Sequence, residues 1–349
     1  MKHNSLIEVK QLKKYFPAKK SSILGGKRYL KAVDDVSFDI LKGETFGLVG
    51  ESGSGKSTVG RCILRLHDLT DGEVFYDGEA IGSLPKAELK PYRQKMQVIF
   101  QDPHSSLNPM MVVEDLIMEP LNVYGIGTRR ERKQRVLDLV EKVGLSARHL
   151  DRYPHEFSGG QRQRIGIARA LASNPEFIVC DEPISALDVS IQAQIVNMLE
   201  DLQAELGLTY LFIAHDLSMV RHISHRIGVM YLGKLMEKGP AEAIYQNPRH
   251  PYTKALLGSM LEPYPRQADE RKPVALKGDI PSPLNPPTGC RFVTRCPYAM
   301  PICREVEPRF TEVSPGHMAA CHLLDKSDNG ATIGKDQRAP HTAEPDIVE

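Results

Sequence analysis

The chain has 349 residues, of which 41% are hydrophobic and 26% are charged. This length and composition exclude a small or largely unfolded protein and predict one large domain with an appendage. The net charge of +1 gives no electrostatic reason to expect a nucleic-acid partner, and no apolar run reaches the roughly 18 residues that a membrane span needs.

Five short segments have the pattern of strands. Residues Val33–Ile40 alternate between polar and apolar side chains, as a half-buried strand does. The runs Phe46–Val49, Gln97–Phe100, Phe177–Cys180 and Tyr210–Ala214 are short and apolar, which is typical of strands that are covered on both faces. We therefore predict an α/β fold around a mostly parallel sheet.

The most specific motif follows the run Phe46–Val49 directly. Residues 50 to 57 read Gly-Glu-Ser-Gly-Ser-Gly-Lys-Ser, a complete G-x-x-x-x-G-K-[ST] phosphate-binding loop. Such a loop aims backbone N–H groups and a helix N-terminus at phosphates, while Lys56 reaches the β and γ oxygens and Ser57 ligates Mg²⁺. The predicted nucleotide-binding residues of this segment are Gly50, Glu51, Ser52, Gly53, Ser54, Gly55, Lys56, Ser57 and Thr58.

Beyond this loop the periodicity becomes helical, most clearly in Arg130–Val143 and Gln161–Leu171. We expect a helical subdomain over about residues 102 to 172, inserted between two strands of the core.

An acidic pair ends the apolar run Phe177–Cys180. A buried strand places Asp181 at its carboxyl end, beside the phosphate loop, where its carboxylate can hold Mg²⁺ directly or through water. Glu182 follows at the sheet edge. There it can orient and partly deprotonate the water that attacks the γ-phosphate.

The last third of the chain changes in character. Residues Arg226–Gly239 have the pattern of a hairpin that turns at residues 232 and 233, and prolines recur after residue 248. We expect an ATPase domain over residues 1–250, a loop-rich C-terminal module over 251–325, and a polar tail over 326–349 without stable structure.

One motif gives the chain a specific resemblance. Residues 157–162 read Phe-Ser-Gly-Gly-Gln-Arg, which is similar to the signature of the ATP-binding subunits of ABC transporters, with Phe157 where leucine is usual. Ser158 is a suitable helix N-cap, and Gly159 and Gly160 let a phosphate approach the following helix. The resemblance implies a head-to-tail dimer in which Ser158, Gly159, Gly160 and Gln161 contact the partner's ATP. It also implies an antiparallel β portion beside the main sheet.

The same resemblance assigns roles to further residues. Gln101 matches the Q-loop glutamine, which contacts Mg²⁺ and the attacking water near the surface that meets the membrane subunits. His215 matches the switch histidine that contacts the γ-phosphate. The D-loop, which contacts the other subunit of the dimer, is matched by Ser185, Ala186, Leu187 and Asp188.

An aromatic side chain is expected to stack on adenine. The segment Leu12–Phe16 supplies two candidates upstream of the phosphate loop. The family's stacking residue aligns best with Phe16. Tyr15 is the alternative, and a packing role in a strand is open for either ring.

The C-terminal segment narrows the resemblance to the oligopeptide/dipeptide importers. It is carried by residues 289–303, by Cys321, and by the sequence His-Pro-Tyr-Thr-Lys-Ala-Leu at residues 250–256. This branch implies Mg²⁺-dependent ATP hydrolysis that energises solute uptake from the cytoplasmic face of the membrane. The implied partners are a second, usually nonidentical ATPase subunit, two transmembrane permease subunits and an extracytoplasmic solute-binding protein.

Four of the six cysteines form a candidate metal site. The N-terminus lacks the apolar core of a secretory signal, so we expect reduced thiols and no disulfides. Cys290, Cys296, Cys303 and Cys321 lack the paired CxxC spacing of zinc sites, and a [4Fe–4S] cluster is favoured over zinc or unliganded thiols. We expect this module to be separate from the ATP site. Cys62 and Cys180 are predicted to be packing residues.

Three functional alternatives differ in what they require. A soluble ABC ATPase that acts on nucleic acid or ribosomes usually carries two ATPase domains or long helical arms, and the chain has one set of motifs. A module that binds ATP without hydrolysing it would not need Lys56, Asp181, Glu182 and His215 together. An importer for nickel or another small solute would share the same C-terminal segment as a peptide importer.

Overall fold

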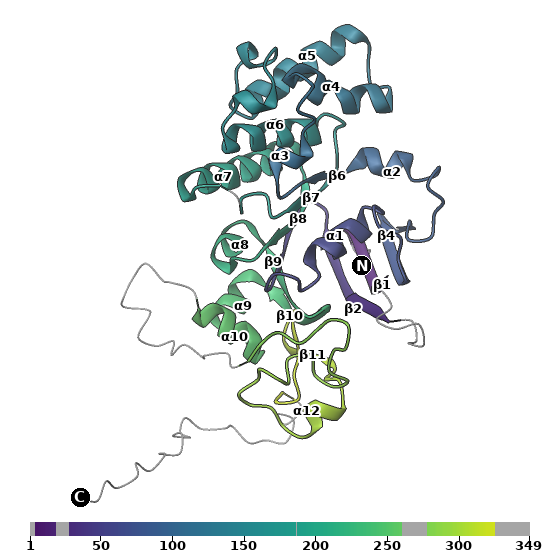
Figure 1. Cartoon of the computed structure of the whole chain (residues 1–349), viewed down its shortest axis with the longest axis vertical. Coiled ribbons are helices and arrows are strands. Elements are labelled where there is room, and N and C mark those ends of the chain that lie inside the picture. The colour runs from purple at the N-terminus through teal and green to yellow at the C-terminus, as the bar shows by residue number, and fades with distance from the viewer. Residues whose placement is uncertain (1–3, 19–27, 186, 260–277, 325–349) are drawn as a thin grey trace, which may run out of the picture.

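The computed structural model describes residues 4–18, 28–185, 187–259 and 278–324. A layer of helices lies at one end of the molecule, the two sheets lie in the middle, and the C-terminal segment lies at the other end (Figure 1). The tail predicted over residues 326–349 and the D-loop residue Ala186 lie outside the described residues.

The smaller sheet is antiparallel, in the order β2-β1-β4-β5. Its strands are β1 Ser5–Pro17, β2 Tyr29–Leu41, β4 Asp71–Tyr76 and β5 Glu79–Ala80. Strand β2 contains the predicted segment 33–40 and is longer, because it pairs with β1 from Ser5 to Pro17. Register shifts interrupt this pairing at several points of β1. Each shift breaks the two-residue periodicity, and this explains why the sequence pattern did not reveal β1.

The larger sheet has the order β11-β12-β10-β9-β3-β8-β7-β6. The five strands from β9 to β6 are parallel, and the remaining pairs are antiparallel. The bounds are β3 Thr45–Val49, β6 Met96–Ile99, β7 Phe177–Asp181, β8 Thr209–Ala214, β9 Arg226–Tyr231, β10 Lys234–Pro240, β11 Phe310–Ser314 and β12 His317–Ala320. Each apolar run predicted as a strand is therefore confirmed.

The predicted hairpin is also confirmed. Strands β9 and β10 are joined by Leu232 and Gly233, whose φ angles are 45° and 82°. Two consecutive residues with positive φ are what a two-residue hairpin turn requires, because its twist then matches that of the strands.

The helices that lie between β6 and β7 in the chain form a separate layer at one end of the molecule, and helices elsewhere in the chain lie beside the sheets (Figure 1). Their bounds are α1 Lys56–Ile63, α2 Lys90–Lys95, α3 Pro103–Ser106, α4 Val113–Tyr124, α5 Arg129–Lys142, α6 Gly159–Leu171, α7 Val189–Leu206, α8 Leu217–Ile223, α9 Ala241–Gln246, α10 Pro251–Gly258 and α12 Ile302–Glu305, with short 3₁₀ turns η1 Ala147–His149 and η2 Pro154–Glu156. The predicted helical segments correspond to α5 and α6.

Helix α6 begins two residues earlier than predicted. The Ser158 hydroxyl accepts a hydrogen bond from the Gln161 N–H at 3.3 Å, and the Gln161 side chain accepts one from the Ser158 N–H at 3.0 Å. This reciprocal capping satisfies two backbone donors at the helix end. It therefore allows both signature glycines to lie in the first helical turn.

The C-terminal segment shares the hydrophobic core of the rest of the molecule. Tyr252, Phe292 and Val293 belong to the same buried cluster as Val49 of β3 and Val229 of β9. Strand β12 also pairs with β10 and extends the larger sheet. The hydrophobic core is thus continuous across residue 250. Among the described helices, none has the length and apolar character of a membrane span.

Candidate functional site

The phosphate loop lies between β3 and α1. Gly50 and Gly55 have φ angles of 148° and 104°, and a Cβ atom there would lie about 2 Å from the carbonyl oxygens of Met230 and Ala32. Only glycine fits these close backbone approaches. The loop residues Ser52, Gly53, Gly55, Lys56, Ser57 and Thr58 line a cavity of about 880 Å³.

Lys56 is buried within this loop. Its Nζ donates hydrogen bonds to the carbonyl oxygens of Gly50 at 2.7 Å and Glu51 at 3.0 Å. Burial lowers the pKa of Lys56, and the nearby carboxylates of Glu182, Asp181 and Glu51 oppose that shift by favouring the charged form. The ammonium group lies inside the loop, where we expect a phosphate to bind.

The structure brings together two of the three residues predicted to hold Mg²⁺. The Ser57 hydroxyl donates a hydrogen bond to the Asp181 Oδ1 at 2.6 Å. Asp181 is buried at the end of β7, and the Arg61 guanidinium lies 3.8 Å from its other oxygen. A hydroxyl and a carboxylate oxygen are hard ligands of the kind that Mg²⁺ prefers, so these residues fit the ion.

Glu182 lies next to both other predicted catalytic residues. Gln101 Nε2 donates a hydrogen bond to Glu182 Oε2 at 2.8 Å, and His215 Nδ1 lies 3.7 Å from the same oxygen. The φ angle of Glu182 is 48°, which is an uncommon backbone conformation for a residue with a side chain. Residues in such conformations often occur at functional sites. Gln101, Glu182 and His215 all line the cavity that contains the phosphate loop.

Phe16 also lines that cavity, together with Leu30 and Pro283. Its ring is half-buried and contacts His67 edge to face, with ring centres 5.4 Å apart. Tyr15 has a different role, because its hydroxyl donates a hydrogen bond to the carboxylate of Asp34. This geometry favours Phe16 over Tyr15 as the residue that contacts adenine.

We expect Phe16→Ala to weaken ATP binding by about 1 to 3 kcal/mol, because a base–aromatic stack would be lost. Phe16→Tyr should bind nearly as well as the wild type, since the ring face is kept. Calorimetric titration with ATP measures both, and Tyr15→Ala is the matched comparison. A loss with Tyr15→Ala and none with Phe16→Ala would show that the assignment is displaced by one residue.

The signature residues do not line the cavity of their own phosphate loop. Ser158 caps α6, and a Cβ atom on Gly160 would lie 2.6 Å from the Ile191 side chain. The predicted anion-binding helix end thus lies outside the cavity of its own chain, as the expected head-to-tail dimer would require. Of the D-loop residues, Ser185 lines the cavity, while Leu187 and Asp188 immediately precede α7.

The four C-terminal cysteines lie in one region of the structure. Cys290, Cys303 and Cys321 are buried, Cys296 is partly exposed, and none forms a disulfide. The pKa of Cys290 is raised to about 12, mainly by burial and to a smaller extent by the other three cysteines nearby. Within the described residues, no group of three or more His, Cys, Asp or Glu side chains is placed to hold a metal ion. The predicted iron–sulfur or zinc centre is therefore not supported by these positions.

Cys62 and Cys180 are fully buried, as predicted.

Two contacts to the phosphate loop were not predicted. The Glu51 N–H donates a hydrogen bond to the Tyr252 hydroxyl at 2.9 Å, and Arg295 Nη1 donates one to Glu51 Oε2 at 2.7 Å. The expectation that the cysteine-containing segment is separate from the ATP site is therefore wrong at Glu51. No sequence pattern connects residues that are 201 and 244 positions apart.

Comparisons with known proteins identify the family of the chain. The model of the ABC transporter family matches residues 33–185, and that of the oligopeptide/dipeptide transporter C-terminal region matches residues 236–303. The chain is 57% identical over 329 residues to the putative oligopeptide transport ATP-binding protein YkfD of Bacillus subtilis strain 168, covering 94% of this chain and 98% of the relative. It is 53% identical over 320 residues to the oligopeptide transport ATP-binding protein AppF of the same organism, and this match covers 91% of this chain and 97% of the relative.

A solved structure of similar fold is the dimeric ATP-binding cassette MJ0796 in a post-hydrolysis state bound to ADP and Pi. It has a TM-score of 0.60 and 31% identity, and the match covers 67% of this chain and 98% of that one. Together, the fold, the phosphate loop and the acidic pair define a phosphate-loop ATPase that binds Mg²⁺ and ATP. The chain belongs to the ABC transporter family, in the branch that carries the oligopeptide/dipeptide transporter C-terminal region.

Proposed function

We propose that this chain is the ATP-hydrolysing subunit of an importer for dipeptides or oligopeptides. The observation that carries the solute class is the match of residues 236–303 to the oligopeptide/dipeptide transporter C-terminal region. The names of relatives that align along more than nine-tenths of the chain support it. The ATPase activity follows from the family, and the peptide solute is the proposed part.

The proposed chemistry uses residues that already lie around one cavity. Lys56 and the loop N–H groups would bind the β- and γ-phosphates, and Phe16 would contact adenine. Ser57, Asp181 and Gln101 would hold Mg²⁺, which supplies charge neutralisation for the phosphates. Glu182 would orient the attacking water and accept its proton, while His215 would contact the γ-phosphate.

The partner's signature helix would close the site. We infer that Ser158, Gly159, Gly160 and Gln161 of each subunit face the ATP bound to the other. In that arrangement the D-loop residues Ser185, Leu187 and Asp188 lie at the dimer interface. Closure around ATP and reopening after hydrolysis would then drive the membrane subunits.

The permease subunits are proposed to contact a groove beside Gln101. This groove has a volume of about 240 Å³ and lies between the end of β6 and helices α4 and α6. Phe100 and Val123 line it and are 37% and 57% exposed, which is high for such apolar side chains. Binding there would hold the chain at the cytoplasmic face of the membrane and place the permease next to the catalytic glutamine. A solute-binding protein would act from the other side of the membrane.

Uptake experiments distinguish peptides from other solutes. A strain that lacks the gene is compared with the same strain carrying the wild-type gene, using labelled dipeptides, longer peptides and nickel ions. We expect the gene to restore uptake of at least one peptide class and to leave nickel uptake unchanged. Restored nickel uptake without any peptide uptake would refute the peptide proposal while leaving the ATPase assignment intact.

A metal centre at the C-terminal cysteines remains part of the proposal. Its support is the donor set: four thiols in one small region, three of them buried and none in a disulfide. Thiolates are soft ligands that suit an iron–sulfur cluster or Zn²⁺, and a metal would replace the protons that the thiols otherwise keep. The side chains would have to move together to bind it.

We expect protein purified without oxygen to be brown and to contain about four irons per chain. Replacing any one of Cys290, Cys296, Cys303 or Cys321 by serine should remove iron and colour, because a hydroxyl is a poor ligand for such a cluster. Cys62→Ser, at a buried packing position, is the control and should keep the colour. One equivalent of zinc in colourless protein would replace the cluster with a zinc site, and metal-free protein would refute both.

A further inference from the structure

The C-terminal segment contacts the phosphate loop at Glu51. Arg295 Nη1 donates a hydrogen bond to Glu51 Oε2 at 2.7 Å across 244 positions of sequence. The two side chains are 10% and 23% exposed. An ion pair with so little solvent contact is screened less than a surface pair. We therefore expect its loss to change the electrostatics of the neighbouring groups.

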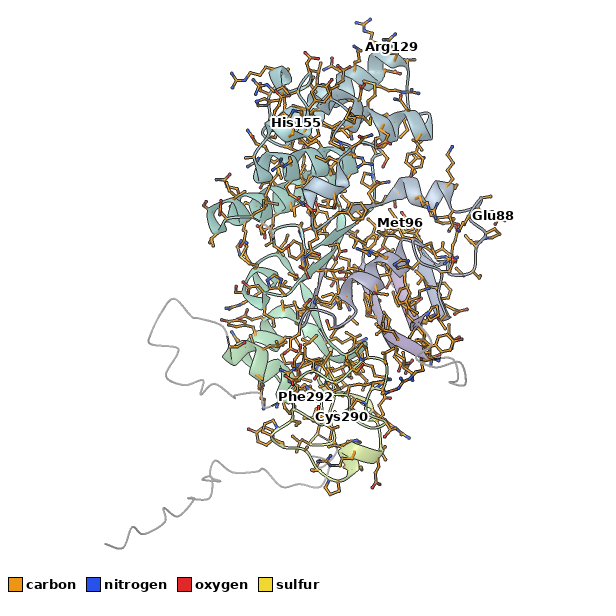
Figure 2. All side chains as sticks on the ribbon, in the orientation of Figure 1. Glu88, Met96, Arg129, His155, Cys290 and Phe292 are labelled. Atoms are coloured by element: carbon orange, nitrogen blue, oxygen red, sulfur yellow. The ribbon has the colours of Figure 1, made fainter. Side chains whose placement is uncertain are left out.

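The backbone of Glu51 is held as well. Its N–H donates to the hydroxyl of Tyr252, a fully buried residue at the start of α10. Tyr252 packs against Tyr231 and Phe292, with ring centres 4.7 Å and 5.3 Å away. Figure 2 shows Phe292 beside Cys290 in the C-terminal segment, at the opposite end of the molecule from Arg129 and His155 of the helical layer. The second residue of the phosphate loop is therefore fixed by groups from this segment at both its backbone and its side chain.

Glu51 places a negative charge in a loop that binds anions. Its carboxylate lies near enough to Lys56 to favour the charged form of that amine, and its carbonyl oxygen already accepts a hydrogen bond from Lys56 Nζ at 3.0 Å. A carboxylate that was free to turn toward Lys56 would compete with the ATP phosphates for the same ammonium group. Glu51 does not line the ATP cavity while it is bonded to Arg295.

We propose that Arg295 is a positioning residue that holds the Glu51 carboxylate away from Lys56 and so keeps Lys56 available for phosphate. Arg295 neutralises the acidic side chain, and Tyr252 fixes the loop backbone next to it. The C-terminal segment then affects ATP affinity through a direct contact, although it contributes neither the phosphate loop nor the catalytic acids. This inference rests on the proposed ATP site at Lys56.

The test compares four full-length variants by calorimetric titration with ATP. We expect Arg295→Gln to raise the Kd about three- to tenfold, because Glu51 becomes a competitor for Lys56. Glu51→Gln removes the competitor, so the double variant should bind ATP more tightly than Arg295→Gln alone. Arg295→Lys keeps the charge and should stay near the wild type. In the assembled transporter, Arg295→Gln should raise KM and leave kcat nearly unchanged.

The control is Glu307→Gln, which removes an ion pair between the same segment and Lys234 of β10 without touching the phosphate loop. An equal loss of ATP affinity in this control would show that any loosening of the segment suffices, and it would overturn the proposal. So would a double variant that binds no better than Arg295→Gln. If Lys56→Ala binds ATP like the wild type, the ATP site itself is misassigned, and the proposed function fails together with this inference.

Discussion

Replacing Glu182 by glutamine should lower ATP turnover of the assembled transporter by a factor on the order of 10² or more. Glutamine keeps the shape of the side chain and can still contact Gln101, but it cannot accept a proton from water. ATP affinity should change little, because Lys56 and the loop N–H groups are untouched. The closed, ATP-bound dimer should therefore accumulate.

Phosphate release measures the turnover, and nucleotide retained after rapid gel filtration measures the trapped state. Glu141→Gln is a suitable control, since Glu141 is an exposed carboxylate on α5. Near-normal phosphate release by Glu182→Gln would mean that another group activates the water. Of the residues around Glu182, His215 would then be the first to examine, because it lies 3.7 Å from the same carboxylate oxygen.

Replacing Lys56 by alanine should weaken ATP binding itself, by about 10- to 100-fold, because a charge-assisted contact to the phosphates is lost. Turnover at low ATP concentration should fall at least as far. Lys56 is buried, and its Nζ also bonds the loop carbonyls of Gly50 and Glu51. The substitution therefore removes a support of the loop as well as the charge.

Titration with ATP and a thermal unfolding curve separate these two effects. A variant that unfolds at the wild-type temperature but binds poorly has lost the phosphate contact alone. Lys86→Ala changes an exposed lysine and should match the wild type in both measurements. Unchanged binding and turnover by Lys56→Ala would contradict the assignment of residues 50–57 as the ATP site.

The parts of the site that the sequence predicted are those with strict chemical requirements. Phosphate needs glycines at close backbone approaches, a lysine and a hydroxyl, and these requirements place Gly50, Gly55, Lys56 and Ser57 in a recognisable order. The parallel strands could be predicted because burial on both faces makes their sequences continuously apolar. Gln101 and His215 were assigned through family resemblance, and the structure places both beside Glu182.

Other features of the structure have no pattern in the sequence that would predict them. Strand β1 was missed because its register shifts break the alternation of side chains. The contact between Arg295 and Glu51 joins distant residues, and each of them alone has the character of an ordinary surface charge. For the cysteines the residue type alone predicts metal binding, whereas in the described structure the four thiols are not placed together as ligands.

The central claim is that ATP hydrolysis at this loop drives peptide movement. The most direct measurement uses vesicles that contain both permease subunits and both ATPase chains, with ATP at the ATPase face and peptide-loaded binding protein at the other. Phosphate release and labelled peptide transport are then recorded together. We predict that both occur with the wild-type chain and that both stop with Glu182→Gln. Peptide transport that continues with Glu182→Gln, or hydrolysis that never moves peptide, would contradict the claim.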